Sequence, residues 1–169
     1  MGSDYYNSMI LPYAGIIIKV CRAYTNSQED FEDYYQEVCL QIWRSHERFK
    51  KQCAWTTWIY KIALNVCLTY LKKKQHSPLT FASDSLPEEV IQDSKGLSEN
   101  SVRSLYQAIH HLSEIDRAII LLYLEEQSNQ TIAEIIGISA NNVGVRIVRI
   151  KQRLTKLMNA GDTHNDEVN

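Results

Sequence analysis

Apolar side chains recur at intervals of three and four residues through much of residues 5–75. No stretch there alternates apolar and polar positions between turn residues, as a half-buried strand would. Residues 31–44 place an apolar stripe on one face, with Cys39 at its edge: Phe31, Tyr34, Tyr35, Val38 and Ile42. This spacing predicts a helix whose stripe lies in a core.

A second helix is predicted over residues 54–74. Its inward side is expected to carry Trp55, Ile59, Ile62, Val66 and Tyr70. Its other side is expected to carry Thr57, Lys61, Asn65, Leu68 and Lys72. The helical pattern then breaks over residues 76–100, which contain two of the three prolines, several serines and five acidic residues. That composition predicts a flexible acidic linker.

Helical spacing resumes after the linker, where Val102, Leu105, Ile109 and Leu112 predict one amphipathic helix. Helix starts are marked by residues that cap well: Ser113 with Asp116 three positions on, then Ser128 or Asn129, then Ser139.

Two helices, a short one over residues 130–136 and a longer one from Ala140 to near Leu157, are joined by a three-residue turn at Gly137. This is helix-turn-helix spacing. The small Ala133 suits a helix crossing, and glycine permits the sharp turn. The shared core is predicted to be Ile132, Ile136, Ile138 and Val143.

Charge is segregated, although the formal net charge is only −2. Residues 129–157 hold five basic residues against one glutamate: Arg146, Arg149, Lys151, Arg153 and Lys156. These side chains would contact phosphates, and Asn141 and Asn142 could reach base edges in a major groove. The alternative is an ordinary amphipathic surface helix.

The face opposite the stripe of residues 31–44 is acidic and polar, and carries Asp33, Gln36, Glu37, Leu40 and Arg44, flanked by Trp43. A solvated face is the common explanation for such a set, but Leu40 and Trp43 favour a partner surface. The next helix is basic and carries Trp55 and Trp58, as suits an unpaired strand whose bases stack on rings. Core positions are the alternative for these tryptophans.

Other classes are disfavoured by composition. The 44% hydrophobic content excludes a disordered chain. No apolar run is long enough to span a bilayer and no signal peptide is evident, so we expect a cytoplasmic protein without membrane insertion. The four cysteines lack zinc-site spacing, so we expect no metal and no cofactor. Phosphate-loop and hydrolase motifs are absent, so no enzyme activity is expected.

Three stretches together resemble the ECF (extracytoplasmic-function) sigma factors, small bacterial proteins that direct RNA polymerase to promoters. "EDFEDYYQEVCLQIWRSHERF" looks like the sigma-two signature E-D-x-x-Q-E-V-F-x-x-x-W, and "AWTTWIYKIALNVCLTYLKKK" looks like the promoter-melting segment. "LSEIDRAIILLYLEEQSNQTIAEIIGISANNVGVRIVRIKQRL" is similar to the sigma-four domain. The chain departs from the family pattern at Gly144, Val145 and "KKQCAW".

The resemblance implies an all-α fold with a sigma-two-like domain (5–75), a linker (76–100), a helix-turn-helix sigma-four-like domain (101–158) and a disordered tail (159–169). It implies an alternative sigma factor whose partners are core RNA polymerase and promoter DNA, and an anti-sigma factor is common in the family. A helix-turn-helix regulator with an N-terminal interaction domain is the alternative. An interaction adaptor with no DNA role is a third hypothesis.

Site residues follow from the matched positions and from the faces described above. The core-polymerase set is Asp33, Gln36, Glu37, Leu40 and Trp43. The set expected to bind the opened minus-ten strand is Trp55, Trp58, Lys61, Asn65 and Lys72. The set expected to bind the minus-thirty-five element is Asn141, Asn142, Arg146, Arg149, Lys151 and Arg153.

Overall fold

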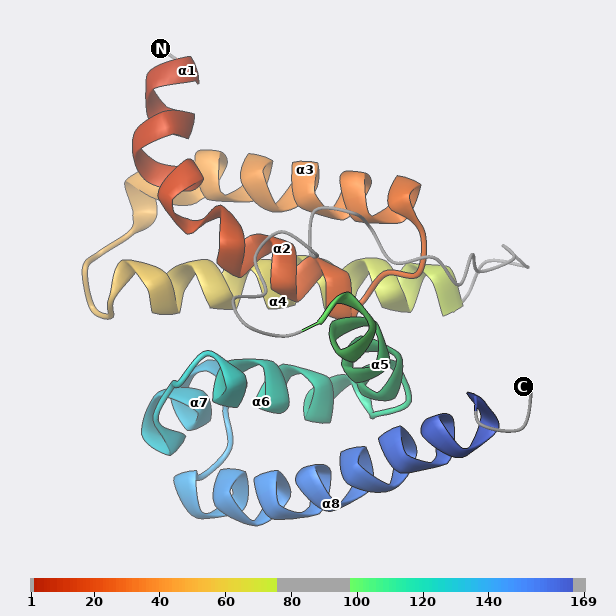
Figure 1. Cartoon of the computed structure of the whole chain (residues 1–169). Helices are drawn as coiled ribbons and strands as arrows, with labels where there is room; N and C mark the ends of the chain where they lie inside the picture. Colours follow the sequence, from red (N-terminus) through yellow and green to blue (C-terminus); the bar gives the residue numbers. More distant parts are fainter. Residues whose placement is uncertain (1, 76–97, 166–169) are drawn as a thin grey trace. The chain divides into compact units, whose positions relative to one another are not determined.

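The structure is a computed structural model that describes residues 2–75 and 98–165 (Figure 1). All regular elements in these two ranges are helices, which confirms the all-helical class. The chain divides into two compact units, Met1–Asp93 and Ser94–Asn169. Most of the expected linker, residues 76–97, lies outside the described residues.

The first unit begins with three short turns, α1 (Gly2–Tyr5), η1 (Tyr6–Ile10) and η2 (Leu11–Tyr13), which lead into α2 (Ala14–Ala23). Its two long helices are α3 (Gln28–Ser45) and α4 (Trp55–Gln75), with the short η3 (His46–Arg48) between them. Helices α2, α3 and α4 pack pairwise around one core (Figure 1). The stripe predicted on α3 lies in that core: Phe31, Tyr34, Val38 and Ile42 are buried, and Tyr35 is half-buried.

On α4 the predicted division into two sides is partly wrong. Thr57, expected outside, is only 6% exposed, and Ile62, expected inside, is half-buried. The cause is that both α2 and α3 pack against α4, so its buried arc is wider than one stripe. That arc includes Ile59, Tyr60, Ala63, Leu64, Val66 and Cys67.

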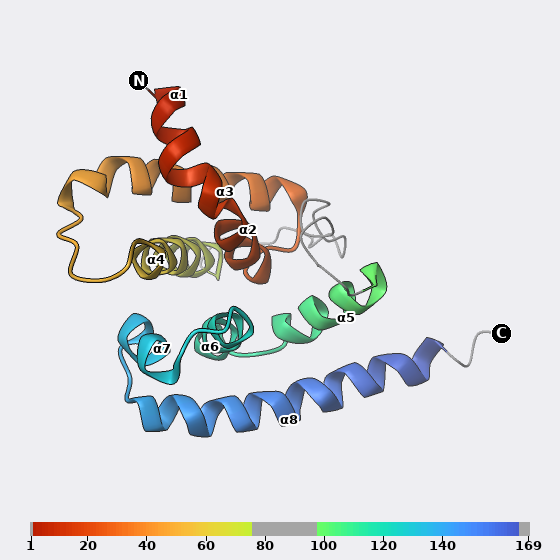
Figure 2. The same cartoon turned by 60° about the vertical axis from the view of Figure 1, so that its left-hand side comes forward.

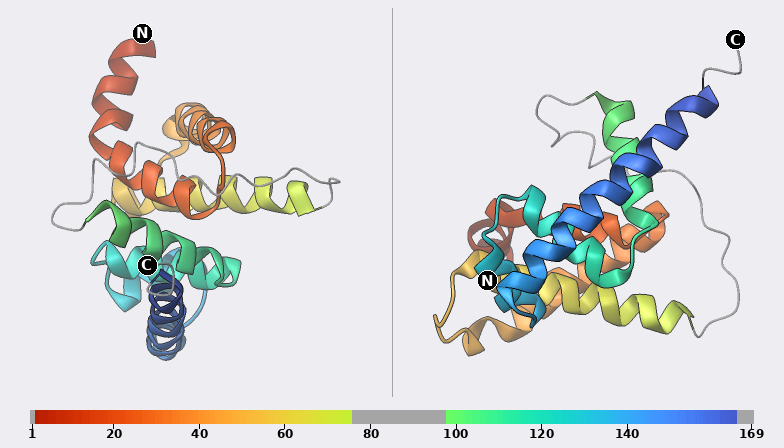
Figure 3. Two further views of the ribbon diagram at one scale, coloured as in Figure 1. Left: turned by 45° about the vertical axis from the view of Figure 1, so that its right-hand side comes forward. Right: turned by 90° about the horizontal axis from the view of Figure 1, so that it is seen from below.

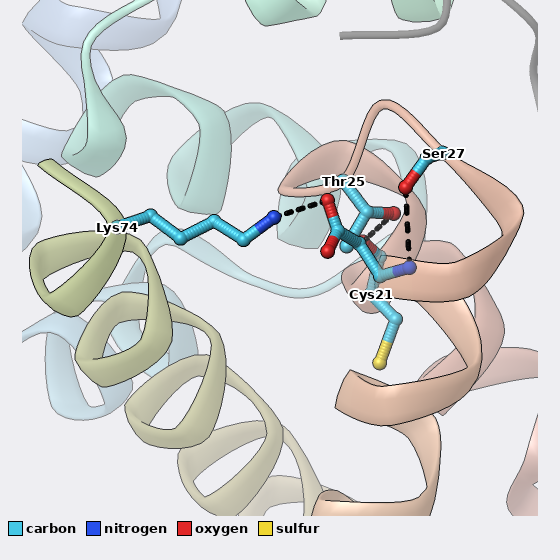
Figure 4. A network of polar contacts seen from close by, with 5 residues as sticks. Cys21, Thr25, Ser27 and Lys74 are labelled. Carbon is cyan, nitrogen blue, oxygen red and sulfur yellow. Dashed lines mark hydrogen bonds and ion pairs between the residues drawn. The ribbon is translucent and has the colours of Figure 1, made fainter. Parts of the chain in front are cut away.

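A polar network fixes the connection between α2 and α3 (Figure 4). The Thr25 hydroxyl donates to the Cys21 carbonyl at 2.8 Å, which satisfies a carbonyl near the end of α2. The Ser27 hydroxyl accepts from the Asp30 amide at 3.2 Å and caps α3. The Asp30 carboxylate in turn pairs with Lys74 near the end of α4. The first turn of α3 is thereby tied to the last turn of α4.

The second unit contains α5 (Glu99–His110), α6 (Glu114–Leu124), α7 (Asn129–Ile136) and α8 (Ala140–Asn165). Helices α5, α6 and α7 all pack against α8 (Figures 2 and 3). The predicted caps are serines in the structure: Ser113 caps α6, and Ser128 rather than Asn129 caps α7. The Ser139 hydroxyl accepts from the Asn142 amide at 3.1 Å.

The turn between α7 and α8 has the predicted helix-turn-helix form. Gly137 ends α7 in the left-handed region, with φ of 84° and ψ of 33°, where a side chain would be strained. Ile132 and Val143 are fully buried beside the turn, whereas Ile136 and Ile138 are half-buried. This arrangement sets the direction in which α8 leaves the turn.

The C-terminal part of α8 differs from the prediction. The helix was expected to end near Leu157 and to be followed by a disordered tail over 159–169, but it continues to Asn165. No proline interrupts these residues, and extending an existing helix avoids the cost of nucleating a new one. Residues 166–169 lie outside the described part of the chain.

Candidate nucleic-acid and partner interfaces

The polar side of α3 forms one continuous accessible face. Asp33 and Gln36 are exposed, and Glu37 is half-buried and accepts a hydrogen bond of 2.8 Å from the Gln41 amide. Leu40 and Trp43 lie on the same face and are 38% and 40% exposed. The structure therefore brings together the five residues predicted to bind a partner, which we call the α3 face.

An aromatic contact holds Trp43 at the edge of the α3 face. The Tyr5 ring meets the indole edge-on, with ring centroids 4.8 Å apart, and lies 4.7 Å from the His46 ring. His46 also hydrogen-bonds through Nδ1 to the Trp43 carbonyl oxygen. The contacts of Tyr5 and His46 with Trp43 were not predicted from the sequence. They join the N-terminal turn to the end of α3, and these segments are far apart in the chain. The contacts leave Trp43 ordered and still open to solvent.

At the start of α4, Phe49, Trp55 and Trp58 form a compact aromatic cluster. The two indole centroids lie 4.7 Å apart, and the Phe49 ring is 5.0 Å from Trp55 and 5.2 Å from Trp58. Trp55 is further fixed by a 3.2 Å hydrogen bond from its Nε1 to the Met9 carbonyl. Both tryptophans are half-buried. They therefore have a packing role and remain partly accessible.

Basic and polar groups precede the two tryptophans of this cluster in the chain and follow them along α4. Lys50 and Lys51 are exposed in the connection before α4, and Lys51 takes a positive φ of 55°. Farther along α4, Asn65 and Lys72 are exposed and Lys61 is half-buried. An open groove of about 390 Å³ runs between α3 and α4, with Asn65 in its wall. The residues predicted for the opened strand thus lie along one helix, but only some of them are fully accessible.

The basic residues of α8 fall into two groups. Three bond to other helices or connections of the same unit: Arg146 Nη1 lies 2.8 Å from Asp116 Oδ1, and Lys151 Nζ lies 3.1 Å from the Tyr123 hydroxyl. Arg153 Nη2 donates to the His111 carbonyl at 3.1 Å. Arg149 and Lys156 are exposed, as are Lys151 and Arg153 in spite of their bonds, whereas Arg146 is half-buried. Periodicity alone could not separate these groups, because the bonding partners are at least 28 residues away in sequence.

The outermost face of α8 carries more than the predicted polar residues. Val143, Ile147, Ile150 and Leu154 are buried. On the opposite side lie Asn141, Val145, Val148 and Gln152, all exposed. Val145 is 45% exposed and Val148 is 57% exposed. Charges and amides alone indicated the predicted contacts of this helix; Val145 was noted only as a departure from the family pattern, and Val148 was not predicted.

The cysteines are free thiols: Cys21 and Cys67 are buried, and Cys39 and Cys53 are half-buried. Burial raises the pKa of Cys39 to about 11 and that of Cys67 well above its usual value, so both remain protonated at neutral pH. Among residues 2–75 and 98–165, no cluster of His, Cys, Asp and Glu could hold a metal ion. Within the same two ranges, no helix is both long and apolar enough to span a bilayer.

Comparison with protein families gives two matches. The model of sigma-70 region 2 matches residues 9–77, and that of sigma-70 region 4 matches residues 103–154. The chain is 29% identical over 161 residues to the ECF RNA polymerase sigma-E factor of Haemophilus influenzae, covering 88% of this chain and 85% of that protein. It is 25% identical over 165 residues to SigW of Bacillus subtilis, covering 90% and 88%.

A solved structure also has this fold: the sigma factor RpoE of Bartonella quintana, in complex with the anti-sigma factor NepR. Its TM-score is 0.75, with 18% identity over 93% of this chain and 98% of that chain. The two region matches occur in the order expected from the quoted motifs, and the H. influenzae and B. subtilis relatives align across most of their length. The chain therefore belongs to the ECF family of RNA polymerase sigma factors, which direct the polymerase to promoters and are not themselves enzymes.

Proposed function

We propose that three surfaces divide the work of this sigma factor. The α3 face binds core RNA polymerase, the aromatic and basic side of α4 holds the opened minus-ten strand, and α8 binds the duplex of the minus-thirty-five element. An anti-sigma factor that covers the α3 face would block binding to core polymerase. The Bartonella sigma factor is in complex with an anti-sigma factor, which supports a partner of this class here.

The observation that carries the proposal is the composition of the α3 face. Leu40 and Trp43 are large apolar side chains exposed on the same helix face as the carboxylate of Asp33. Acidic groups repel DNA phosphates, so the partner of this face is a protein with basic and apolar groups rather than nucleic acid. A tryptophan that is ordered before binding loses little side-chain entropy on docking, which favours an energetic role for Trp43.

The aromatic cluster favours an unpaired strand over a duplex as the partner of α4. The indole N–H of Trp55 donates a hydrogen bond to the Met9 carbonyl and holds that side chain in place. Trp58 is therefore the better candidate for stacking on a base. Base stacking on an aromatic ring contributes about 1 to 3 kcal/mol per base. Unpairing a base costs a few kcal/mol, so the two effects are of similar size. The lysines near the cluster would follow the strand's phosphates.

On α8 we assign the two kinds of basic residue to different roles. Arg149 and Lys156 contact phosphates, and Asn141 and Asn142, near the N-terminus of the helix, reach base edges. Arg146, Lys151 and Arg153 hold α8 against the rest of the unit, because their polar groups already bond within it. Fewer residues of α8 are therefore proposed to contact the minus-thirty-five element than the number of its basic residues would predict.

A reconstituted assay with the full chain and core RNA polymerase tests the proposal. The full chain should confer sequence-selective initiation on core enzyme, and Leu40→Ala should weaken its binding to core. Leu11→Ala is the matched control, because Leu11 is 51% exposed in the same unit but lies outside the α3 face. If the chain selected promoter duplex without core enzyme and never bound that enzyme, the helix-turn-helix regulator would be the correct reading.

A further inference from the structure

The outermost face of α8 carries two exposed valines, one turn apart. Val145 and Val148 are 45% and 57% exposed, on the side opposite the residues that α8 buries. Neither valine is needed to close the core of the second unit, which α8 contributes to through Val143, Ile147, Ile150 and Leu154. We call Val145 and Val148 the valine pair.

Valine is a poor choice for an exposed helix position, unless a partner covers it. Its branched side chain lowers helix propensity relative to alanine, and its methyl groups gain nothing from contact with water. The valine pair therefore looks like a contact surface. Its neighbours indicate the chemistry of the partner, because Arg149 directly follows Val148 and Asn141 lies one turn before Val145 on the same face.

A cation and an amide beside an apolar pair match the edge of a DNA major groove. Phosphates flank the groove, and amides pair with the hydrogen-bonding groups of base edges. Thymine alone among the four bases presents a methyl group there, and apolar side chains recognise thymine through that methyl. A purely apolar protein surface would leave both Asn141 and Arg149 without a polar partner.

We propose that Val145 and Val148 read thymines in the minus-thirty-five element by packing against their 5-methyl groups. This inference depends on the proposed function of α8 as the helix that enters the major groove. Three residues of helix advance about 4.5 Å, slightly more than the 3.4 Å between stacked bases. The valine pair therefore spans neighbouring thymines, on one strand or on both.

The proposal predicts a measurable penalty for removing one methyl group. Burial of one such carbon contributes about 0.8 kcal/mol, which corresponds to about a fourfold change in affinity. Deoxyuridine pairs with adenine as thymidine does and keeps the O4 acceptor, so replacing thymidine with deoxyuridine removes the methyl group alone. The matching change on the protein is Val148→Ala or Val145→Ala, which also raises helix propensity and so preserves α8.

The experiment uses the full chain with core RNA polymerase. Duplexes are selected from a random pool, and each thymidine in the upstream element of the selected duplex is replaced singly with deoxyuridine. We expect about fourfold weaker binding at one or two positions. In the valine variant that loses the contact, the same replacement should have no effect, as a double-mutant cycle between one methyl group and one side chain requires. Thr155→Ala, exposed farther along α8, is the control that should keep the parent's sensitivity.

The outcomes separate this inference from the proposed function. If every deoxyuridine duplex bound as well as its parent while Arg149→Ala still weakened binding, α8 would contact DNA and the thymine assignment would be wrong. If Arg149→Ala also left binding to the selected duplex unchanged, the DNA role of α8 itself would fail. Normal DNA binding by the valine variants, together with loss of self-association in sedimentation, would assign the valine pair to a protein contact.

Discussion

Arg146 and Arg149 are three residues apart on α8, and the structure predicts opposite consequences for their loss. Arg146 Nη1 lies 2.8 Å from Asp116 Oδ1 on α6, with the two side chains 34% and 23% exposed. Arg146→Ala leaves the Asp116 carboxylate partly buried without that cation. Arg149 is exposed and takes part in none of the ion pairs described above, so Arg149→Ala removes no comparable bond.

The size of the Arg146 effect follows from the exposure of the pair. Fully exposed ion pairs contribute about 0.2 to 1 kcal/mol, and hydrogen bonds to charged groups contribute about 1.5 to 3 kcal/mol. Solvent still reaches about a third of the Arg146 side chain, so it screens the interaction. The contribution of the pair therefore does not exceed the lower end of the range for charged hydrogen bonds, about 1.5 kcal/mol. We expect Arg146→Ala to destabilise the second unit by about 1 to 1.5 kcal/mol.

The position of the tryptophans allows the unfolding of the two units to be followed separately. All three tryptophans, Trp43, Trp55 and Trp58, lie in the first unit. Tryptophan fluorescence therefore follows the first unit, whereas far-ultraviolet circular dichroism follows the helices of both. In urea, Arg146→Ala should shift the circular dichroism transition and leave the fluorescence transition in place. Asp116→Ala should have a similar effect, and the double variant should cost less than the sum of the two.

In DNA binding, Arg149→Ala rather than Arg146→Ala is expected to have the larger effect. Each phosphate contact adds about 0.9 to the slope of log affinity against log salt concentration. Arg149→Ala should reduce that slope by about one when the full chain and core polymerase bind a promoter duplex. Arg146→Ala should leave the slope unchanged. A slope reduced by about one in Arg146→Ala, with both unfolding transitions unaltered, would refute the reasoning and place Arg146 against DNA.

Three further predictions concern the first unit. Asp33→Arg should weaken core-polymerase binding by about 2 to 5 kcal/mol, because it leaves a basic partner group unpaired. An unchanged affinity in a binding titration with core polymerase would exclude the α3 face as the polymerase-binding surface. Trp58→Ala or Asn65→Ala should slow opening of closed promoters, and a pre-melted bubble should restore transcription; failure of the bubble to rescue would make these residues structural. Iodoacetamide at pH 8 should label Cys53 before Cys39, as read by peptide mass spectrometry, because burial holds the Cys39 pKa at about 11. The buried neutral thiol favours the folded state below the unfolded pKa of about 9, and that contribution is lost as the pH rises from about 9 to 11.

Features that depend on neighbours in sequence could be predicted, since a cap or a turn is decided within a few residues. Ser113, Ser128 and Ser139 each accept from an amide three positions later. Gly137 takes the left-handed conformation that ends α7. The apolar stripe of α3 was also predictable, because one stripe faces one core and its period is that of the helix itself.

Features that depend on distant partners could not be predicted from periodicity. Trp55 donates to a carbonyl 46 residues away, and Arg153 to one 42 residues away. The burial of Thr57 results from two helices packing on α4, and the sequence pattern of α4 alone does not contain that information. Such contacts determine which members of a predicted site are accessible, so a site read from sequence includes residues whose main role is packing.

The number of phosphate contacts made by α8 affects how the chain finds DNA. If all five basic residues of α8 met phosphates, they would add about 4.5 to the salt slope, whereas Arg149 and Lys156 alone add about 1.8. Duplex binding by the second unit is then weak at physiological salt, because few counterions are released. Contacts of amides and methyl groups with bases act only at short range. They cannot replace the long-range electrostatic attraction between basic residues and DNA phosphates. On the proposed assignment of the surfaces, stable promoter binding would therefore require further contacts from core polymerase after it binds the α3 face, and the enzyme interface would be a condition for DNA recognition.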